Sequence, residues 1–266
     1  MRKWTAIALL APLIATVAFA QSGTKKRRPL PYEYGEVVIR NYSSGAGLSP
    51  VQFDHWLHRT FYTCRVCHVD IGFAMKANAT GIKAADNIKG YYCGACHNGK
   101  MSHGDRKIFA ACETKYAKDD LKRCYRCHSK GEAVRREYDF AAFIARFPKE
   151  RFGNTVDWEK AEELGLIKPI DQIEGVSIQR APLDVQKDFA ISAKVETMPE
   201  IIFSHRKHTV WNGCELCHPE IFPSLKKGSA KYTMMEIFDG KYCGACHMTV
   251  AFPTTDCQRC HSKPVR

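Results

Sequence analysis

The sequence predicts a mostly irregular chain with short α-helices and little β structure, built from two tandem modules. Three observations predict this fold class. The unit Cys-x-x-Cys-His occurs six times, and the segment that begins at Phe53 recurs after a shift of 150 residues, at Phe203. The second copy is also too short to bury a large side-chain core. Groups attached to the cysteines must therefore supply most of the buried apolar surface.

The repeated unit uses twelve of the thirteen cysteines and leaves only Cys112. Its cysteines are Cys64, Cys67, Cys93, Cys96, Cys124, Cys127, Cys214, Cys217, Cys243, Cys246, Cys257 and Cys260. The histidines that follow them are His68, His97, His128, His218, His247 and His261. Two thiols three positions apart on a helical turn can form thioethers to the vinyl groups of haem, and the next residue then points its imidazole at the iron. We therefore expect six covalently bound haem c groups, each with one of these histidines as its proximal ligand.

Other uses of paired cysteines fit the pattern less well. Structural zinc sites combine Cys-x-x-Cys pairs into sets of four ligands and do not need a histidine after every pair. A thioredoxin-like redox motif needs no following histidine and would not recur at every pair. A disulfide framework would take the cysteines without regard to the histidines.

The N-terminal segment is typical of a secretory signal. Met1–Lys3 is basic, an apolar stretch follows, and Ala18 and Ala20 supply small residues at a cleavage position. We expect residues 1–20 to be removed and the protein to be periplasmic, because c-type haem is attached outside the inner membrane. The alternative is an uncleaved anchor that keeps the protein at the membrane, although Trp4–Ala20 is at the short limit for spanning a bilayer.

The basic charge does not predict a nucleic-acid partner. A formal net charge of +12 over 266 residues would otherwise favour binding to nucleic acid or to a membrane. Each haem, however, carries two propionates and contributes about −1 when oxidised and about −2 when reduced. The haems would offset most of the positive charge, so we expect the lysines to pair with propionates and solvent.

The repeat divides the chain into five parts. Residues 53–97 and 203–247 share 15 identities in 45 positions without a gap, and a third motif, CYRCHSK or CQRCHSK, closes each copy. We expect a signal segment at 1–20, an N-terminal extension at 21–52, module one at 53–135, a connecting segment at 136–200 and module two at 201–266. Module one has the longer spacing between its second and third motifs, and this insertion carries His103 and Cys112.

Few regular elements are predicted outside the motifs. Glu36–Arg40 has the pattern of a strand, and Asp157–Leu166 is typical of a short helix with Asp157 near its start and Gly165 near its end. The connecting segment is rich in Phe, Ile and Val. We therefore expect it to be an ordered wrap over the haem edges and not a free linker.

Five histidines remain after the proximal ligands are assigned. Each module opens with Phe-x-His-x-x-His, and this pattern contains four of them: His55, His58, His205 and His208. Histidines three positions apart lie on neighbouring helical positions and can face two different irons. We expect these four to be distal haem ligands, and the alternative is that they are ordinary surface or core residues.

Each module resembles the triheme cytochrome c-seven family, a compact relative of the tetraheme c-three cytochromes. The resemblance rests on the Phe-x-His-x-x-His opening and the three Cys-x-x-Cys-His units, and it covers about 150 of the 266 residues. It implies a multihaem cytochrome c made of two c-seven-like triheme modules. In that family the first histidine of the opening pair binds the first haem and the second binds the second haem. The implied axial pairs are His55 with His68, His58 with His97, His205 with His218, and His208 with His247.

The third haem of module two departs from the family pattern, because no histidine precedes the second motif. Met234 and Met235 stand there, where module one has Ala84 and Ala85. A methionine thioether is an accepted axial ligand, so we expect Met234 or Met235 opposite His261. The alternative is that both methionines fill the core.

The third haem of module one also lacks a ligand of the family type. We expect His103, in the insertion, to bind opposite His128. Met75 and Met101 are rival ligands. Cys112 is expected to be a buried bystander thiol.

The predicted ligands indicate electron transfer and not an enzyme. Two histidines on an iron leave no place for a substrate, and closely spaced haems pass electrons to their neighbours. We expect an exported carrier or conduit between redox partner proteins. Two alternatives stay open: a subunit of a larger complex, quinone-linked in the inner membrane or placed at the outer surface, and an oxyanion reductase with an open iron. Assembly into a homo-oligomer or a filament also stays open.

Overall fold

The structure, a computed structural model, describes residues 28–112, 121–130, 132, 138–180, 187–193, 195 and 197–263. The chain divides into two compact units, Met1–Leu30 and Pro31–Arg266. All elements and sites below belong to the second unit. The expected signal segment at residues 1–20 lies outside the described residues.

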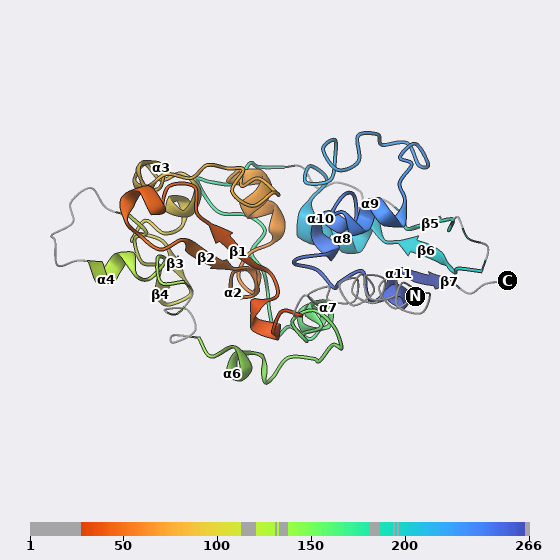
Figure 1. Cartoon of the computed structure of the whole chain (residues 1–266), viewed down its shortest axis with the longest axis horizontal. Helices are drawn as coiled ribbons and strands as arrows, with labels where there is room; N and C mark the ends of the chain where they lie inside the picture. The colour runs from red at the N-terminus through yellow and green to blue at the C-terminus, as the bar shows by residue number, and fades with distance from the viewer. Residues whose placement is uncertain are drawn as a thin grey trace, which may run out of the picture. The chain divides into compact units, whose positions relative to one another are not determined.

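Short elements joined by turns and loops make up this unit (Figure 1). The longest helix among the described residues, α8, has eight residues. With η for 3-10 and π turns, the elements in chain order are η1 (Pro31–Glu33), β1 (Glu36–Ile39), η2 (Ser44–Ala46), β2 (Val51–Asp54), α2 (His55–His58), η3 (Val66–Asp70), α3 (Ala84–Ile88), η4 (Tyr92–Ala95), β3 (Ser102–His103), β4 (Arg106–Lys107), α4 (Leu121–Cys124), α6 (Phe140–Ile144), α7 (Trp158–Glu163), β5 (Phe189–Ile191), β6 (Glu200–Phe203), α8 (His205–Asn212), α9 (Met234–Phe238), α10 (Gly244–His247), α11 (Cys257–Cys260) and β7 (His261–Lys263). The predicted fold class, mostly irregular with short helices and little β structure, is confirmed.

A pair of antiparallel strands leads into each histidine pair. β1 pairs with β2, with Val37 opposite Phe53, and β5 pairs with β6, with Phe189 opposite Phe203. β7 adds a third strand on the other side of β6 (Figure 1). β1 confirms the strand predicted at Glu36–Arg40, apart from its last residue. The two copies therefore share an incoming strand as well as the repeated motifs.

The helices before the second motif of each module begin through the same capping interaction. In α3 the backbone N–H of Lys83 donates to the Asp86 carboxylate at 3.0 Å. In α9 the backbone N–H of Thr233 donates to the Glu236 carboxylate at 2.8 Å. Such caps satisfy backbone donors that the start of a helix leaves unpaired. Since these positions align in the repeat, both copies place a helix before the second motif in the same way.

A glycine allows each of these helices to lie directly against the second motif. A Cβ at Gly94 would stand 1.9 Å from the carbonyl oxygen of Asn87, and one at Gly244 would stand 1.9 Å from that of Ile237. A side chain cannot be accommodated so close to a backbone atom, and glycine has none. The "CGACH" that the two copies share thus has a steric reason for its glycine.

The main side-chain core joins α2 to the connecting segment. Buried Trp56 and Leu57 of α2 pack with buried residues of that segment, which are Ile144, Phe147, Val156, Trp158, Ala161 and Ile167. Among residues 203–262, by contrast, the buried apolar side chains are Leu216 and Ile237. The described part of the connecting segment is therefore packed, while module two has little side-chain core of its own.

Local signals set the ends of α7 within this core. The Asp157 carboxylate accepts a hydrogen bond from the backbone N–H of Lys160 at 3.1 Å, which caps the start of the helix. Gly165 follows the helix with a φ of 68°, a left-handed conformation that favours glycine. The predicted helix is confirmed, with α7 covering the first part of the expected range.

Within the part of the chain that the structure describes, no helix is both long enough and apolar enough to cross a membrane.

Candidate functional site

One phenylalanine contacts both histidines of each opening motif. The ring of Phe53 meets that of His55 edge-on, at 4.9 Å and 89°, and lies 4.3 Å from that of His58. In module two Phe203 contacts the corresponding pair at 4.9 Å and 89°, and at 4.5 Å. The sequence repeat is therefore also a repeat of side-chain geometry, in which one phenylalanine orients two imidazoles differently.

His55 faces His68 across a gap that fits a single metal ion. The two ring centres are 6.3 Å apart and the ring planes differ by 3°. An imidazole nitrogen binds a metal at about 2.0 Å and the ring centre lies roughly 1.1 Å behind it, so two axial rings should have their centres about 6 Å apart. The observed separation is the one expected for two axial ligands of one iron.

The second pair of each module has the same geometry in both copies. The ring centres of His58 and His97 are 6.3 Å apart with planes at 57°, and those of His208 and His247 are 6.1 Å apart with planes at 59°. Rotating one ring about the axis through the iron changes the angle between the planes but not this distance. Both pairs therefore fit two imidazoles on opposite sides of an iron.

Eight of the eleven histidines bond Nδ1 to a backbone carbonyl oxygen, at 2.7–3.1 Å. They are His55, His58, His68, His128, His208, His218, His247 and His261. A carbonyl can only accept, so Nδ1 carries the proton and Nε2 keeps the lone pair that binds a metal. Among the described residues, the Nδ1 atoms of His97, His103 and His205 are buried without a hydrogen bond of normal geometry.

Burial favours the neutral form of five of these imidazoles. It is the main cause that lowers the pKa of His55, His97 and His247 to about 4, and it lowers the pKa of His58 and His208 as well. The neutral imidazole is the form that binds a metal. At neutral pH these rings can therefore bind iron without first losing a proton.

The cysteines complete a donor set that fits haem c. All thirteen cysteines lie within the described residues, and none of the twelve motif cysteines is in a disulfide. Each motif thus offers two thiols for the vinyl groups and a histidine for the iron, and facing histidines supply a second axial ligand. When haem is bound, it supplies the redox-active iron. The chain would supply the attachment sites and, at the three facing pairs, two histidine ligands with their orientation.

Cysteines of successive motifs in module one lie close together. Burial, together with nearby Cys127 and Cys112, raises the pKa of Cys93 to about 12. Burial, together with nearby Cys96, raises the pKa of Cys67 to about 12. The third, second and first motifs therefore follow one another in space.

The first motif of module one lies beside the second motif of module two. Burial, and then the nearby Cys64, raises the pKa of Cys246 to about 12. A Cβ placed at Gly35 would lie 3.5 Å from the Cβ of His55 and 3.7 Å from the carbonyl oxygen of Thr249. Residues of module one and module two therefore lie close together at this point.

Two arginines tie the first motifs of the modules to the connecting segment. Arg180 of that segment lies 2.8 Å from the Asp70 carboxylate and 2.5 Å from the Glu215 carboxylate. Arg65 lies 2.6 Å from the Asp171 carboxylate of the same segment. Since Arg65 and Glu215 stand between the two cysteines of their motifs, the connecting segment fixes both motifs directly.

Other predicted ligands are not brought together in this way. His205 and His218 do not form a facing ring pair of the kind described above. His103, on β3, packs edge-on against Phe61 at 4.5 Å, while Nδ1 of His128 is bonded to the carbonyl of Ser49. The pairing of His103 with His128 therefore stays a prediction.

The methionine ligand of module two also stays a prediction. Met234 and Met235 lie at the start of α9 with side chains that are 42% and 67% exposed. His261, at the start of β7, bonds its Nδ1 to the carbonyl oxygen of Pro199 at 2.7 Å. This bond leaves Nε2 free to bind iron, as in the facing pairs.

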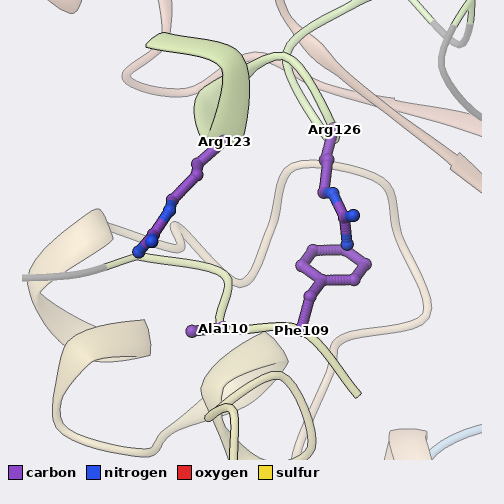
Figure 2. Close-up of a pocket in the computed structure, with 4 residues that line it drawn as sticks. All are labelled: Phe109, Ala110, Arg123 and Arg126. Atoms are coloured by element: carbon purple, nitrogen blue, oxygen red, sulfur yellow. The ribbon is translucent and has the colours of Figure 1, made fainter. Parts of the chain in front are cut away.

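A cavity of about 240 Å³ lies between the second and third motifs of module one. Its walls are Phe109, Ala110, Arg123 and Arg126, and Figure 2 shows the two arginines reaching towards the Phe109–Ala110 segment. The guanidinium carbon of Arg126 is 4.7 Å from the centre of the Phe109 ring, and that ring is 4.5 Å from the ring of His97. The cavity thus places positive charge beside the predicted second and third haems.

Arg59 is a residue at this site that the motifs did not reveal. It follows the ligand candidate His58, yet its side chain lies between Trp158 and Trp211. The aligned residue of module two is Thr209. This difference between the two copies was the one feature of the sequence that could have singled out Arg59.

Comparison with known proteins places this geometry in a family. The family model described as cytochrome c7 and related cytochrome c matches residues 51–129 and 201–262. No curated protein matches the chain. Among solved structures, the C-terminal hexaheme fragment of GSU1996 is similar, with 25% identity, a TM-score of 0.26, and coverage of 89% of this chain and 99% of that one. The N-terminal hexaheme fragment has 23% identity, a TM-score of 0.24, and coverage of 86% and 98%. The dodecaheme cytochrome c GSU1996 has 23% identity, a TM-score of 0.27, and coverage of 86% and 74%.

Proposed function

The chain belongs to the family of cytochrome c7 and related cytochromes c, and on that premise we propose that it carries six covalent haem c groups and transfers electrons between redox partner proteins. It is a multihaem c-type cytochrome. The count of six is supported by the six Cys-x-x-Cys-His motifs, whose cysteines are all free thiols.

The facing imidazoles carry this proposal. In three pairs the ring centres are 6.1–6.3 Å apart, the separation expected for two axial ligands of one iron. An iron bound on both sides by the chain has no open position for a substrate. Such an iron can still gain and lose an electron, so the proposed activity is electron transfer and not conversion of a substrate.

The order of the motifs in space supports a path through the chain. Cysteines of the three motifs of module one are neighbours, and Cys64 lies near Cys246 of module two. Gly35 is packed between His55 and Thr249 at the same boundary. Cys64 also lies near Cys217, in the first motif of module two. We propose that electrons cross between the modules here, between the first haem of module one and the haems of the first two motifs of module two.

The compartment and the partners are part of the proposal. A signal segment at residues 1–20 would export the chain to the periplasm, where the haems would be attached. The redox partners are proteins, soluble or in a membrane-bound quinone-linked complex, and the propionates argue against nucleic acid. Assembly into a homo-oligomer or a filament stays a prediction.

Mass spectrometry and spectroscopy of the purified holoprotein test this function. We expect a mass of the chain without residues 1–20 plus six haems, only low-spin signals in the electron paramagnetic resonance spectrum, and no carbon monoxide binding after reduction. The matched control replaces both cysteines of one motif, Cys243→Ser with Cys246→Ser, and should lose one haem.

The outcomes separate the parts of the proposal. A mass with fewer than six haems would contradict the count. Full haem loading with rapid carbon monoxide binding would contradict closed irons and support a reductase. A mass that includes residues 1–20 would favour the membrane-anchored alternative.

A further inference from the structure

Gly213 lies where the first motif of module one meets the first motif of module two. It directly precedes Cys214, and Arg65 stands between the two cysteines of the other motif. A Cβ at Gly213 would lie 2.6 Å from the Cδ of Arg65 and 2.8 Å from Oε2 of Glu215. The first distance is well below the roughly 3.5–4.0 Å that separates carbon atoms in contact. The side chain of Arg65 therefore occupies the space that a side chain at position 213 would need.

The side chain of Arg65 is held in place and cannot easily move away from Gly213. Its Nη2 donates to the backbone carbonyl oxygen and to the carboxylate of Asp171, both at 2.6 Å, and the side chain is only 14% exposed. Glu215, by contrast, has a side chain that is 43% exposed, so its carboxylate can turn aside at little cost. A residue larger than glycine at position 213 would therefore displace Arg65 from the connecting segment or push the two motifs apart.

The haem motif itself does not require glycine before its first cysteine. None of the other motifs has glycine there, and the residue of module one that aligns with Gly213 is Thr63. Thr63 is buried, and its hydroxyl donates to the Asp171 carboxylate at 2.8 Å. Gly213 instead follows α8 with a φ of 65° and a ψ of −173°, a conformation that is essentially confined to glycine. The two copies thus differ at this position, and the difference makes room for Arg65.

We propose that Gly213 is a positioning residue for electron transfer between the two modules. The inference rests on the proposed function, because it requires haems at these motifs. Cys64 lies near Cys217 and Cys246, so the thioether edges of three haems converge beside the contact between Arg65 and Gly213. Because it has no side chain, Gly213 lets the first motif of module one lie close to module two. It thereby sets the distance that an electron has to cross.

Two NMR measurements on the full haem-loaded chain test this role. In the fully reduced protein, whose low-spin irons are diamagnetic, we expect nuclear Overhauser contacts between the thioether protons of the haem at Cys64 and those of a haem in module two. In protein reduced by one electron per molecule, fast exchange between the modules gives each haem methyl group a single averaged signal. We expect Gly213→Ala to weaken the contacts and to slow this exchange several-fold, which broadens or splits the averaged signals.

The controls separate the space at Gly213 from its backbone conformation. Gly228→Ala adds a Cβ at another positive φ, 79°, where nothing lies within 4 Å, and it should leave the exchange between the modules unchanged. Arg65→Ala removes the Cδ that a Cβ at position 213 would meet. In that background Gly213→Ala should not slow the exchange further, although it should still lower the unfolding free energy, because the backbone strain remains.

The outcomes separate this inference from the proposed function. Unchanged exchange in haem-loaded Gly213→Ala would overturn it, and so would an equal slowing in Gly228→Ala. Wild-type protein with all six haems but no Overhauser contact across the boundary would also overturn it, whatever the variants do. Fewer haems or high-spin irons in the wild type would contradict the proposed function instead. If Gly213→Ala loads haem poorly, Arg65→Trp fills the same space from module one, and unchanged exchange in that variant would overturn the inference.

Discussion

Removing Arg180 should destabilise the protein more than removing any exposed cation. Arg180 joins the connecting segment to Asp70, whose side chain is 0% exposed, and to Glu215, whose side chain is 43% exposed. Both carboxylate oxygens of Asp70 are buried and accept no hydrogen bond of normal geometry among the described residues. The substitution Arg180→Met would therefore leave a buried carboxylate with no charge to compensate it.

The burial of the two acidic partners sets the size of the effect. Breaking a buried ion pair by removing one partner costs about 3–5 kcal/mol, because the other charge stays buried. Since the Arg180 side chain is itself 16% exposed, we take the lower end of that range for Asp70. The exposed pair with Glu215 adds about 0.5 kcal/mol. We expect R180M to lose about 3.5 kcal/mol of unfolding free energy in total.

Guanidinium unfolding of the haem-loaded protein, followed by far-ultraviolet circular dichroism, measures this loss. Lys207→Met is the matched control, because Lys207 pairs with Glu159 on the surface and should lose about 0.5 kcal/mol or less. Asp70→Asn removes the stranded charge, so D70N/R180M should recover about 2 kcal/mol relative to R180M alone. Equal losses in R180M and K207M, or no recovery in the double variant, would refute a buried pair at this position.

Three further predictions test the sites themselves. Gly244→Ala should lower the unfolding free energy by more than about 2 kcal/mol, because its Cβ would lie 1.9 Å from a carbonyl oxygen. The control is Gly45→Ala, which has nothing within 4 Å of its Cβ and should change the unfolding free energy by no more than about 0.5 kcal/mol. Chemical unfolding of both variants measures the difference. His58→Ala should open one iron, so the reduced variant should bind carbon monoxide where the wild type does not; unchanged spectra would contradict its role as a ligand. Cys112→Ser should keep all haems, and a mass lower by one haem would show that Cys112 is an attachment site.

Local signals predicted the elements that local interactions make. The strand at β1 was predictable because its apolar residues form a short β-type run, and α7 was predictable because Asp157 caps it and Gly165 follows it. The repeat also predicted equivalent places for Phe53 and Phe203, since both precede the same pair of histidines. Their common geometry of 4.9 Å and 89° follows from identical residues on equivalent backbone.

Contacts across long stretches of sequence were not predictable. Arg180 meets Asp70, 110 positions earlier in the sequence, and no spacing or pattern links them. The sequence around Arg59 would predict an exposed side chain, because an arginine beside a polar motif is normally exposed. Its burial depends on two tryptophans, from α7 and α8. The sequence therefore predicted what each module holds more readily than how the modules are joined.

One difference between the two copies lies where they are fixed together. Arg65 and Glu215 occupy the same position in the first motif of their modules and have opposite charges. Each pairs with an opposite charge of the connecting segment, Arg65 with Asp171 and Glu215 with Arg180. The side chain of Arg65 also packs onto Gly213, where a Cβ would lie 2.6 Å from its Cδ.

Two identical modules could not form both of these ion pairs with the connecting segment. A glutamate at position 65 would meet Asp171 with like charge, and an arginine at position 215 would meet Arg180 in the same way. Selection for haem binding acts equally on both copies, and it accounts for the residues that they share. The charge reversal needs a second constraint, and a fixed boundary between the modules supplies one. Electron transfer depends steeply on the distance between haems, so a path that carries electrons across that boundary requires the modules to be held at a fixed distance. Two independent triheme carriers on a flexible tether would not require it.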